Sequence, residues 1–233
     1  MHYFPLEWPY LLALFLLLSI VVALLELGIL RYAYERMGIS PRSAVFILVL
    51  TLVGSSINIP LAEFPPERVI SGRVVHHFGM RYVVPVVHQW PATVLAINVG
   101  GALIPILLSL YLAVKNRIVV KSAIAVAVVA LVTHQLAQPV RGVGVALPIF
   151  IPPIIALVCA LVLSWREAGP LAYIGGSMGT LIGADIMNLG KIQGLGAPVA
   201  SIGGAGTFDG VFLVGIVAVL LASLIQPGPR RAA

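Results

Sequence analysis

Charged side chains are scarce in this sequence. They make up 9% of its 233 residues, whereas a soluble globular domain has about 25%. Hydrophobic residues account for 60% of the chain, and the mean hydropathy is +1.08. So few charges cannot cover the water-facing surface of a 24.6 kDa domain, and most apolar side chains are therefore expected to face lipid. The composition excludes an ordinary soluble domain and predicts a membrane protein.

Cysteine and aspartate are also rare. Cys159 is the one cysteine, so neither a disulfide within the chain nor a cysteine-based metal site is possible. The histidines show no metal-binding spacing such as HExxH, and we expect no metal and no cofactor. The fourteen Lys and Arg lie at the ends of apolar runs instead of forming a patch, which argues against a nucleic-acid partner. Of the eight acidic residues, only Asp185 and Asp209 are aspartates.

Long apolar runs make up most of the sequence. Each is near the roughly 20 residues that a helix needs to cross a bilayer. They predict an all-α polytopic transmembrane bundle of about seven spans, forming one integral membrane domain over residues 1–233 with the lipid bilayer as its partner. The predicted spans are 9–30, 43–61, 93–114, 118–138, 145–164, 170–188 and 207–226.

The distribution of basic residues predicts the orientation. Five Lys and Arg lie at the N-terminus and in loops 62–92, 139–144 and 189–206, while nine lie in the other loops and the tail. Because basic loops stay in the cytoplasm, this predicts a multi-pass protein of the cell membrane, N-terminus outside and C-terminus cytoplasmic. In the long external loop 62–92, two valine-rich runs flank residues 77–80, which predicts a β-hairpin.

Glycine is concentrated near the C-terminus, where thirteen of the 23 glycines fall within residues 169–215. Gly175, Gly179 and Gly183 recur every fourth residue, a stripe on which another helix can pack closely. The segment 188–206 between the two aspartates has a single charge, that of Lys191. We predict that it is a partly re-entrant segment before the last helix, buried in protein or lining a wet cavity.

The two aspartates are the candidate catalytic pair. Asp185 lies in about the last turn of the sixth predicted helix and Asp209 in the first turn of the seventh, so both belong to the same leaflet. Two carboxylates that meet in a low-dielectric site share a proton, and can act as an acid and base that activate water. Asp209 has a second interpretation as a simple helix cap.

Polar residues around the pair are candidates for substrate contact. His134, Gln138 and Arg141 are spaced i, i+4 and i+7, which places them on one side of the fourth predicted helix. Lys191 and the glycine-rich loop before the last helix lie at the same predicted membrane boundary. The predicted substrate-binding residues are Gly203, Gly204, Gly206, Thr207, His134, Gln138, Arg141 and Lys191.

The sequence GTFDG at residues 206–210 resembles the glycine-rich second-aspartate motif of presenilin-like intramembrane proteases. This resemblance implies an intramembrane aspartyl protease-like hydrolase that acts on a membrane-embedded peptide, with Asp185 and Asp209 as its catalytic residues. A proton- or cation-coupled transporter of a small ion or solute is the alternative. In that case Asp185 would be the coupling site and Arg141 an anion anchor.

Three further segments carry a family resemblance. They are PIFIPP at 148–153, GADIMNL at 183–189 and GGAGTFDGVFL at 203–213. Together they resemble a prokaryotic multi-pass membrane family known only as a domain of unknown function, the sixteen-fourteen family. The resemblance implies an integral membrane protein and brings no established activity.

Overall fold

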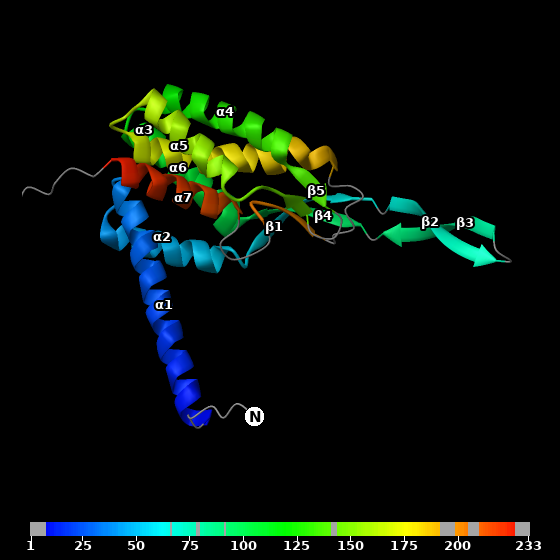
Figure 1. The fold of residues 1–233 in the computed structure, drawn as a ribbon. Coiled ribbons are helices and arrows are strands. Elements are labelled where there is room, and N and C mark those ends of the chain that lie inside the picture. The colour runs from blue at the N-terminus through cyan, green and yellow to red at the C-terminus, as the bar shows by residue number, and fades with distance from the viewer. Residues whose placement is uncertain are drawn as a thin grey trace, which may run out of the picture.

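The computed structural model is mostly helical and carries a small sheet and a long β-ribbon (Figure 1). Most helices lie side by side in a bundle, and the ribbon projects from one end of it (Figure 1). The mostly helical fold agrees with the prediction from composition. The structure describes residues 8–65, 67–77, 80–90, 92–140, 144–191, 199–204 and 210–226.

The first two helices form a sharply bent pair. Helix α1 (Trp8–Arg36) extends away from the bundle, and α2 (Pro41–Gly54) lies along it (Figure 1). The axes of Ala23–Arg36 and α2 differ by 118°. Local sequence explains the break, because Gly38 has a φ of 83° and Ser40 caps α2 by accepting the N–H of Ser43 at 3.2 Å.

Two of the predicted helical spans contain strands of a three-stranded sheet, and the predicted spans 118–138 and 145–164 overlap two shorter strands at residues 138 and 145–146. Helix α2 ends at Gly54, and β1 (Asn58–Phe64) follows it. Strand β4 (Thr93–Asn98) pairs antiparallel with β1, from Asn58 opposite Asn98 to Phe64 opposite Thr93. The predictions of helix over 43–61 and 93–114 are therefore wrong at 58–61 and 93–98. A short apolar run fits a buried strand as well as a helix, so periodicity alone did not distinguish them.

A third strand completes the sheet. Strand β7 (Val199–Ile202) pairs parallel with β4, which gives the order β1-β4-β7. The predicted β-hairpin is confirmed as β2 (Glu67–His77) and β3 (Met80–Trp90), which pair along their full length and form the projecting ribbon (Figure 1).

The remaining elements are helical except for one short hairpin. Two π-helical turns interrupt this part of the chain, one before α3 and one after α6. The elements are η1 (Val99–Leu103), α3 (Ile104–Lys115), α4 (Val119–Leu136), β5 (Gln138–Val140), β6 (Gly144–Ala146), α5 (Ile151–Leu163), α6 (Ala168–Thr180), η2 (Leu181–Asp185), the 3₁₀-helix η3 (Ile186–Lys191) and α7 (Gly210–Ile225).

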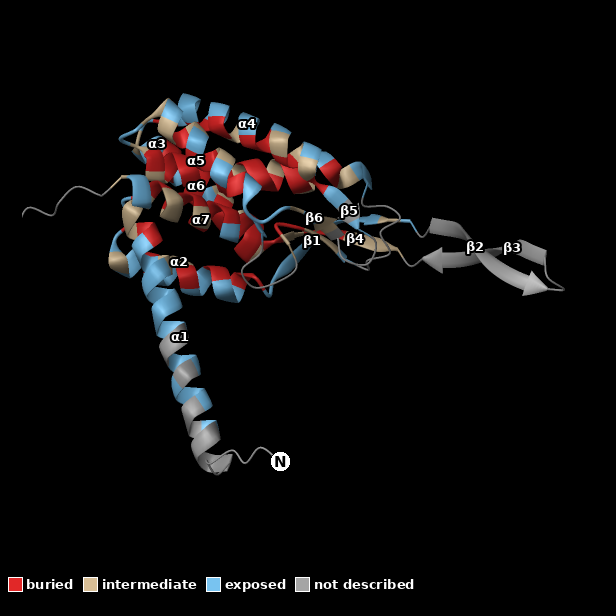
Figure 2. Cartoon of the chain, in the orientation of Figure 1, coloured by how far each residue is buried: buried red, intermediate tan, exposed pale blue. Residues whose placement is uncertain are grey.

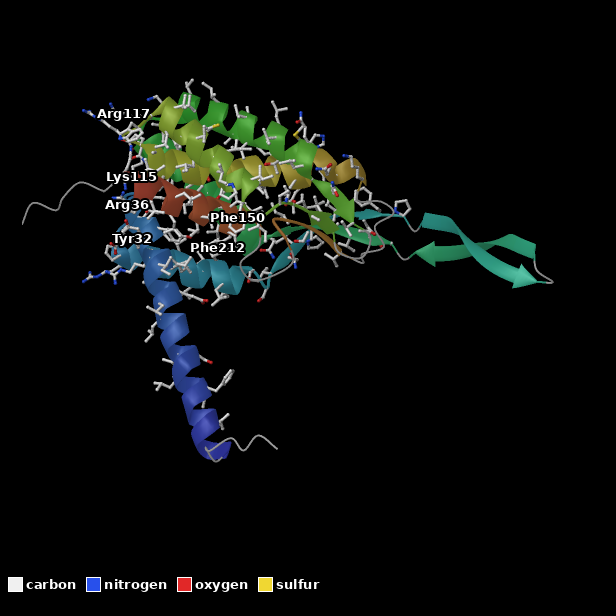
Figure 3. All side chains as sticks on the ribbon, viewed as in Figure 1. Tyr32, Arg36, Lys115, Arg117, Phe150 and Phe212 are labelled. Atoms are coloured by element: carbon white, nitrogen blue, oxygen red, sulfur yellow. The ribbon has the colours of Figure 1, made fainter. Side chains whose placement is uncertain are left out.

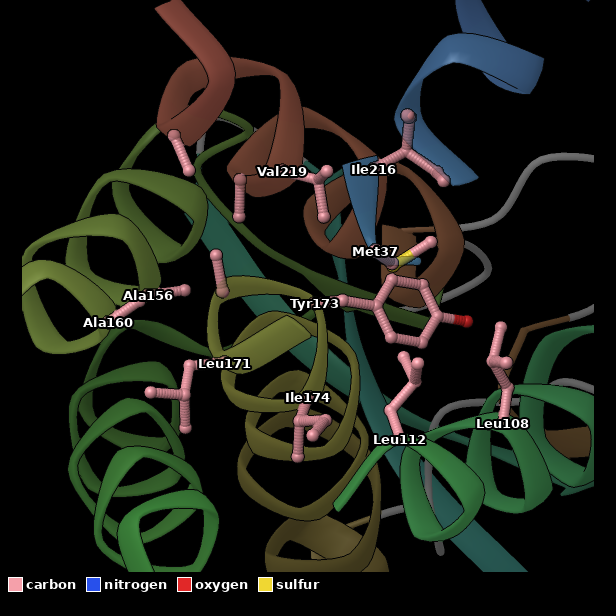
Figure 4. Close-up of a cluster of buried hydrophobic side chains, with 14 of the residues drawn as sticks. Met37, Leu108, Leu112, Ala156, Ala160, Leu171, Tyr173, Ile174, Ile216 and Val219 are labelled. Atoms are coloured by element: carbon pink, nitrogen blue, oxygen red, sulfur yellow. The ribbon is translucent and has the colours of Figure 1, made fainter. Parts of the chain in front are cut away.

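Helix α6 is the centre of the bundle, and burial is densest along it and its neighbours (Figure 2). The ring of Tyr173 is buried beside Met37, Leu108 and Leu112 (Figure 4). The glycine stripe packs against another helix, as predicted, and that helix is α4: a Cβ on Gly179 would lie 2.5 Å from that of Val129. Glycine at these positions therefore lets the two helices approach closely.

The seven predicted spans are not confirmed. Within the described ranges, α4 is the one unbroken helix that is long and apolar enough to cross a membrane, and the α1–α2 pair passes the same test only if it is counted as one bent span. Helices α2, α5 and α7 have 14, 13 and 16 residues, or about 20–24 Å, which is short of a roughly 30 Å hydrocarbon core. The predicted runs shorten because their ends form strands and non-α turns. The one candidate helix suggests membrane association.

Candidate functional site

A polar cluster occupies the end of the bundle where the sheet meets the helices. It is built by the two π-helices η1 and η2, the helix η3 and the end of β7. A π-turn inserts an extra residue into a helix and frees backbone groups, and such turns occur frequently at functional sites. The two π-turns therefore make this end of the bundle the candidate functional site.

Asn98 links the sheet to η1. Its side chain is fully buried and makes three hydrogen bonds. Its Nδ2 donates to the carbonyl of Ser55 at 2.8 Å and to Oδ1 of Asn58 at 3.1 Å. Its Oδ1 accepts the N–H of Gly101 at 2.7 Å, which caps the π-helix. A single amide thus fixes the angle at which strand β4 becomes helix.

A serine extends this network to the third strand. Ser201 on β7 donates through Oγ to Oδ1 of Asn58 at 2.7 Å. Oδ1 of Asn58 therefore accepts from both Asn98 and Ser201, which join β1, β4 and β7 through side chains as well as backbone. The register between β4 and β7 is fixed by these bonds, because a shift of one residue would turn Ser201 to the other face.

The chain turns sharply at the end of β7. Gly203 has a φ of 84° and Gly204 one of 79°, a left-handed conformation that L-residues with side chains rarely adopt. The carbonyl of Gly203 lies against η1, where a Cβ on Gly101 would be only 1.9 Å from it. Two glycines, one in each segment, therefore allow the β7 turn and η1 to touch through their backbones.

Asp185 lies at the end of η2, facing this turn. Its carboxylate is half-buried, and its Oδ2 accepts the backbone N–H of Gly203 at 2.7 Å. A backbone N–H that donates to a carboxylate is a strong, charge-assisted hydrogen bond. The structure therefore brings one predicted catalytic residue and one predicted substrate-binding residue together.

Asn188 satisfies the backbone beneath Asp185. It is fully buried, and its Nδ2 donates to the carbonyls of Gly183 and Ala184, each at 2.9 Å. Lys191 donates through Nζ to Oδ1 of Asn188 at 2.9 Å. The carbonyls that the π-to-3₁₀ transition leaves without helical partners are thus paired inside the protein.

The other predicted site residues have different surroundings. His134 is half-buried at the end of α4, and its Nδ1 has no hydrogen-bond partner within the described ranges. Gln138 is exposed and begins β5, opposite Ala146. Lys191 is exposed and bonds Asn188. Four predicted residues lie outside the described residues: Asp209, Arg141, Gly206 and Thr207.

Sequence analysis gave no role to Asn188 or Ser201. The signal for Asn188 was its position in the apolar run after Gly183, where an amide can bond carbonyls four and five residues back. Ser201 had no local signal, because its partner Asn58 lies 143 residues away. The described part of the chain holds no group of three His, Cys, Asp or Glu residues suited to a metal ion.

Comparison with known proteins identifies a family and no activity. No curated protein and no solved structure is detectably similar to the chain. The comparisons give no support to the presenilin-like resemblance. A family model described as "Protein of unknown function (DUF1614)" matches residues 52–221, which include α3 to α6, the sheet and the polar cluster. It is the sixteen-fourteen family that the three motifs indicated, and the chain belongs to this DUF1614 family.

Proposed function

We propose that the chain is a multi-pass integral membrane protein with its polar cluster at the outer boundary of the membrane. Large apolar side chains are exposed along α1, α3, α4 and α5, as lipid-facing residues would be. Arg36, Lys115 and Arg117 gather at the end of the bundle opposite the β-ribbon (Figure 3). The positive-inside rule then places that end and the C-terminus of α7 in the cytoplasm, and the ribbon outside.

Within this protein we propose an aspartyl protease-like hydrolase that uses Asp185 and Asp209. The observation that carries the proposal is the 2.7 Å hydrogen bond from the N–H of Gly203 to Asp185. Gly203 begins the segment that leads to Asp209, and α7 starts at Gly210 beside the end of α6. The short connection supports a meeting of the two carboxylates.

The proposed chemistry needs a base and an acid on opposite sides of a water molecule. The N–H of Gly203 stabilises the ionised form of Asp185, which suits it to accept a proton from water. The resulting hydroxide adds to the carbonyl carbon of a peptide bond. Asp209 then gives its proton to the leaving amide nitrogen, and the C–N bond breaks.

A membrane-embedded peptide fits the surroundings of the pair. The glycine turn at Gly203 and Gly204 lies beside the carboxylate, so a substrate segment that reaches Asp185 meets backbone without side chains. His134 at the end of α4 adds a polar atom without a partner among the described residues. Gln138, Arg141, Lys191, Gly206 and Thr207 complete the proposed substrate contacts.

Cleavage assays with paired variants test the proposal. The purified protein in detergent is mixed with a panel of single-span membrane peptides, and products are identified by mass spectrometry. We expect Asp185→Asn and Asp209→Asn each to lower cleavage at least 100-fold, while Glu63→Gln, an exposed carboxylate on β1, retains it. Cleavage that persists in either aspartate variant excludes Asp185 and Asp209 as the catalytic pair.

A cation-coupled transporter is the second candidate, and the two π-helices favour it. The interruptions at η1 and η2 bring helix ends together at one end of the bundle, beside the carboxylate of Asp185, as in transporters with discontinuous helices. In this case Asp185 is the coupling site and Arg141 the anion anchor. Proton- or sodium-dependent uptake into proteoliposomes that disappears in Asp185→Asn would support transport, and its absence across a panel of solutes would count against it.

A further inference from the structure

An open groove separates α2 from α3. Its volume is about 510 Å³, within the usual range for small-molecule sites. One stripe of α2 and one stripe of α3 form its walls. Ile47 and Leu50 line it from α2, and Ile104, Leu107 and Leu108 line it from α3.

The groove is polar at one end and apolar at the other. Ser40, Ser43 and Lys115 lie at the polar end, where α2 begins and α3 ends. Leu50 and Ile104 lie at the opposite end. A ligand that fills the groove must therefore have a polar group joined to an apolar body, oriented along the helices.

The length of the groove matches one leaflet. Ile104 and Lys115 are eleven residues apart on α3, which corresponds to about 16 Å of helix. A leaflet contributes half of a roughly 30 Å hydrocarbon core, about 15 Å. One extended acyl chain thus spans the groove from the membrane surface toward the middle of the bilayer.

The charge at the polar end is positive. Lys115 donates through Nζ to the carbonyl of Gly38 at 2.7 Å, and its ammonium lies 5.3 Å from the centre of the Tyr111 ring. These contacts hold one of its three donor hydrogens and leave two for a ligand. Lys115 shares this end of the bundle with Tyr32, Arg36 and Arg117 (Figure 3).

Acidic side chains offset only part of this charge. Glu35 lies near the same end, but it is paired with Arg31, whose Nε donates to it at 2.8 Å. Glu167 lines a separate cavity of about 470 Å³ that also contains Arg36 and Arg166. Among the residues that the structure describes, no acidic side chain lines the groove itself. The mouth therefore favours an anionic group.

We infer that the groove binds one acyl chain of an anionic phospholipid, with the lipid phosphate at Lys115. The inference rests on the proposed insertion in the membrane and is independent of the proposed hydrolysis. Apolar side chains on both walls pack against the acyl chain, and the ammonium attracts the negative charge of the headgroup. The bound lipid also fills the space that separates α2 from α3.

Native mass spectrometry in detergent measures this binding. The probes are phosphatidylglycerol, phosphatidylcholine with the same acyl chains, and inorganic phosphate. We expect phosphatidylglycerol to bind about fivefold more tightly than phosphatidylcholine, which corresponds to about 1 kcal/mol for one basic residue at an anionic surface. Inorganic phosphate at millimolar concentration should not displace the lipid. Equal binding of the two lipids, or full displacement by phosphate, overturns the assignment.

Two pairs of variants locate the site. Lys115→Gln should lower phosphatidylglycerol affinity about fivefold, while Lys121→Gln, an exposed lysine at the same end outside the groove, should not. Leu107→Trp should fill the groove and reduce binding of both lipids at least tenfold. Leu110→Trp is its control, because Leu107 and Leu110 are 58% and 57% exposed and only Leu107 lines the groove.

The outcomes separate the lipid site from the membrane proposal. Unchanged binding in Leu107→Trp, or equal losses in both tryptophan variants, overturns the groove as the site. Protein that stays monomeric and folded without detergent overturns membrane insertion and the lipid site together. Protein that requires detergent but binds neither phospholipid overturns the lipid site alone, and leaves the hydrolase to be tested by the aspartate variants.

Discussion

The carboxylate of Asp185 and the backbone N–H of Gly203 form a 2.7 Å hydrogen bond across eighteen residues of sequence. It joins the end of η2 to the turn after β7, and so ties α6 to the sheet. Because β7 itself is aligned by β4, the position of Asp185 depends on the pairing of strands that are far apart in the chain. The site is therefore sensitive to small changes in this turn.

Gly203→Ala tests that sensitivity. The φ of 84° disfavours alanine, and its Cβ would lie 2.6 Å from the backbone nitrogen of Ala102. We expect the left-handed conformation alone to cost about 1–2 kcal/mol, or about 2–8 °C in Tm. Thermal unfolding in detergent measures the change. Gly190→Ala is the control, because nothing lies within 4 Å of its added Cβ, and equal Tm values for the two variants would contradict the close contact.

Asn98→Leu removes the amide that links β4 to η1. The N–H of Gly101 and the carbonyl of Ser55 lose their side-chain partner in a buried position. We expect a loss of about 2–4 kcal/mol in unfolding free energy, because an unsatisfied buried group costs about 1–3 kcal/mol.

Asn116→Ala is the comparison for this prediction. Asn116 also makes an amide hydrogen bond, to the carbonyl of Leu112 at 2.9 Å, but at a half-buried helix end. Its loss should cost less than about 1 kcal/mol. Chemical denaturation of the two variants in the same detergent decides the order, and a larger loss for Asn116→Ala would show that Asn98 does not fix the sheet.

Val128→Lys tests whether α4 lies in the membrane. Val128 is at the middle of the helix and exposed, where a lysine costs about 2.5–3.5 kcal/mol on insertion. We expect the membrane-integrated fraction after carbonate extraction to fall several-fold. Val120→Lys, one turn from the basic end, should change it little, because a lysine there reaches the interface. Full integration of the Val128 variant would argue against this placement of α4.

Reporter fusions test the orientation. A reporter that is active only in the cytoplasm should give a signal when it is inserted after Asn116, in the turn between α3 and α4. Lys115 and Arg117 flank this position and should hold it on the cytoplasmic side. A reporter that is active only outside the cell should give a signal when it is inserted between β2 and β3, since the ribbon lies at the opposite end of the bundle (Figure 1). Reporters that score on the same side would reject the proposed topology.

The features that sequence predicted well depend on neighbours in the chain. The β2–β3 hairpin follows from turn residues within a few positions. The stripe at Gly175, Gly179 and Gly183 is also local, since its period is that of the helix itself. Such features form independently of how the rest of the chain folds.

The features that sequence missed depend on pairing over long distances. The stretch 58–61 forms a strand because β4 supplies its hydrogen-bonding partners. The residues within the stretch do not indicate that partner. The same holds for Asp185, whose placement at a helix end was predicted, but whose bond to Gly203 requires β7 to lie beside β4. The seven predicted spans are not confirmed, and hydropathy alone could not settle their lengths because it does not distinguish helix from strand.

The sequence by itself determined the mainly helical fold, the hairpin and the family, because composition and local pattern carry that information. Only the tertiary structure decided where the helices end, that a three-stranded sheet closes one end of the bundle, and which backbone group meets Asp185. The physical reason is that a polar backbone group removed from water must find a partner, and that partner can lie anywhere in the chain.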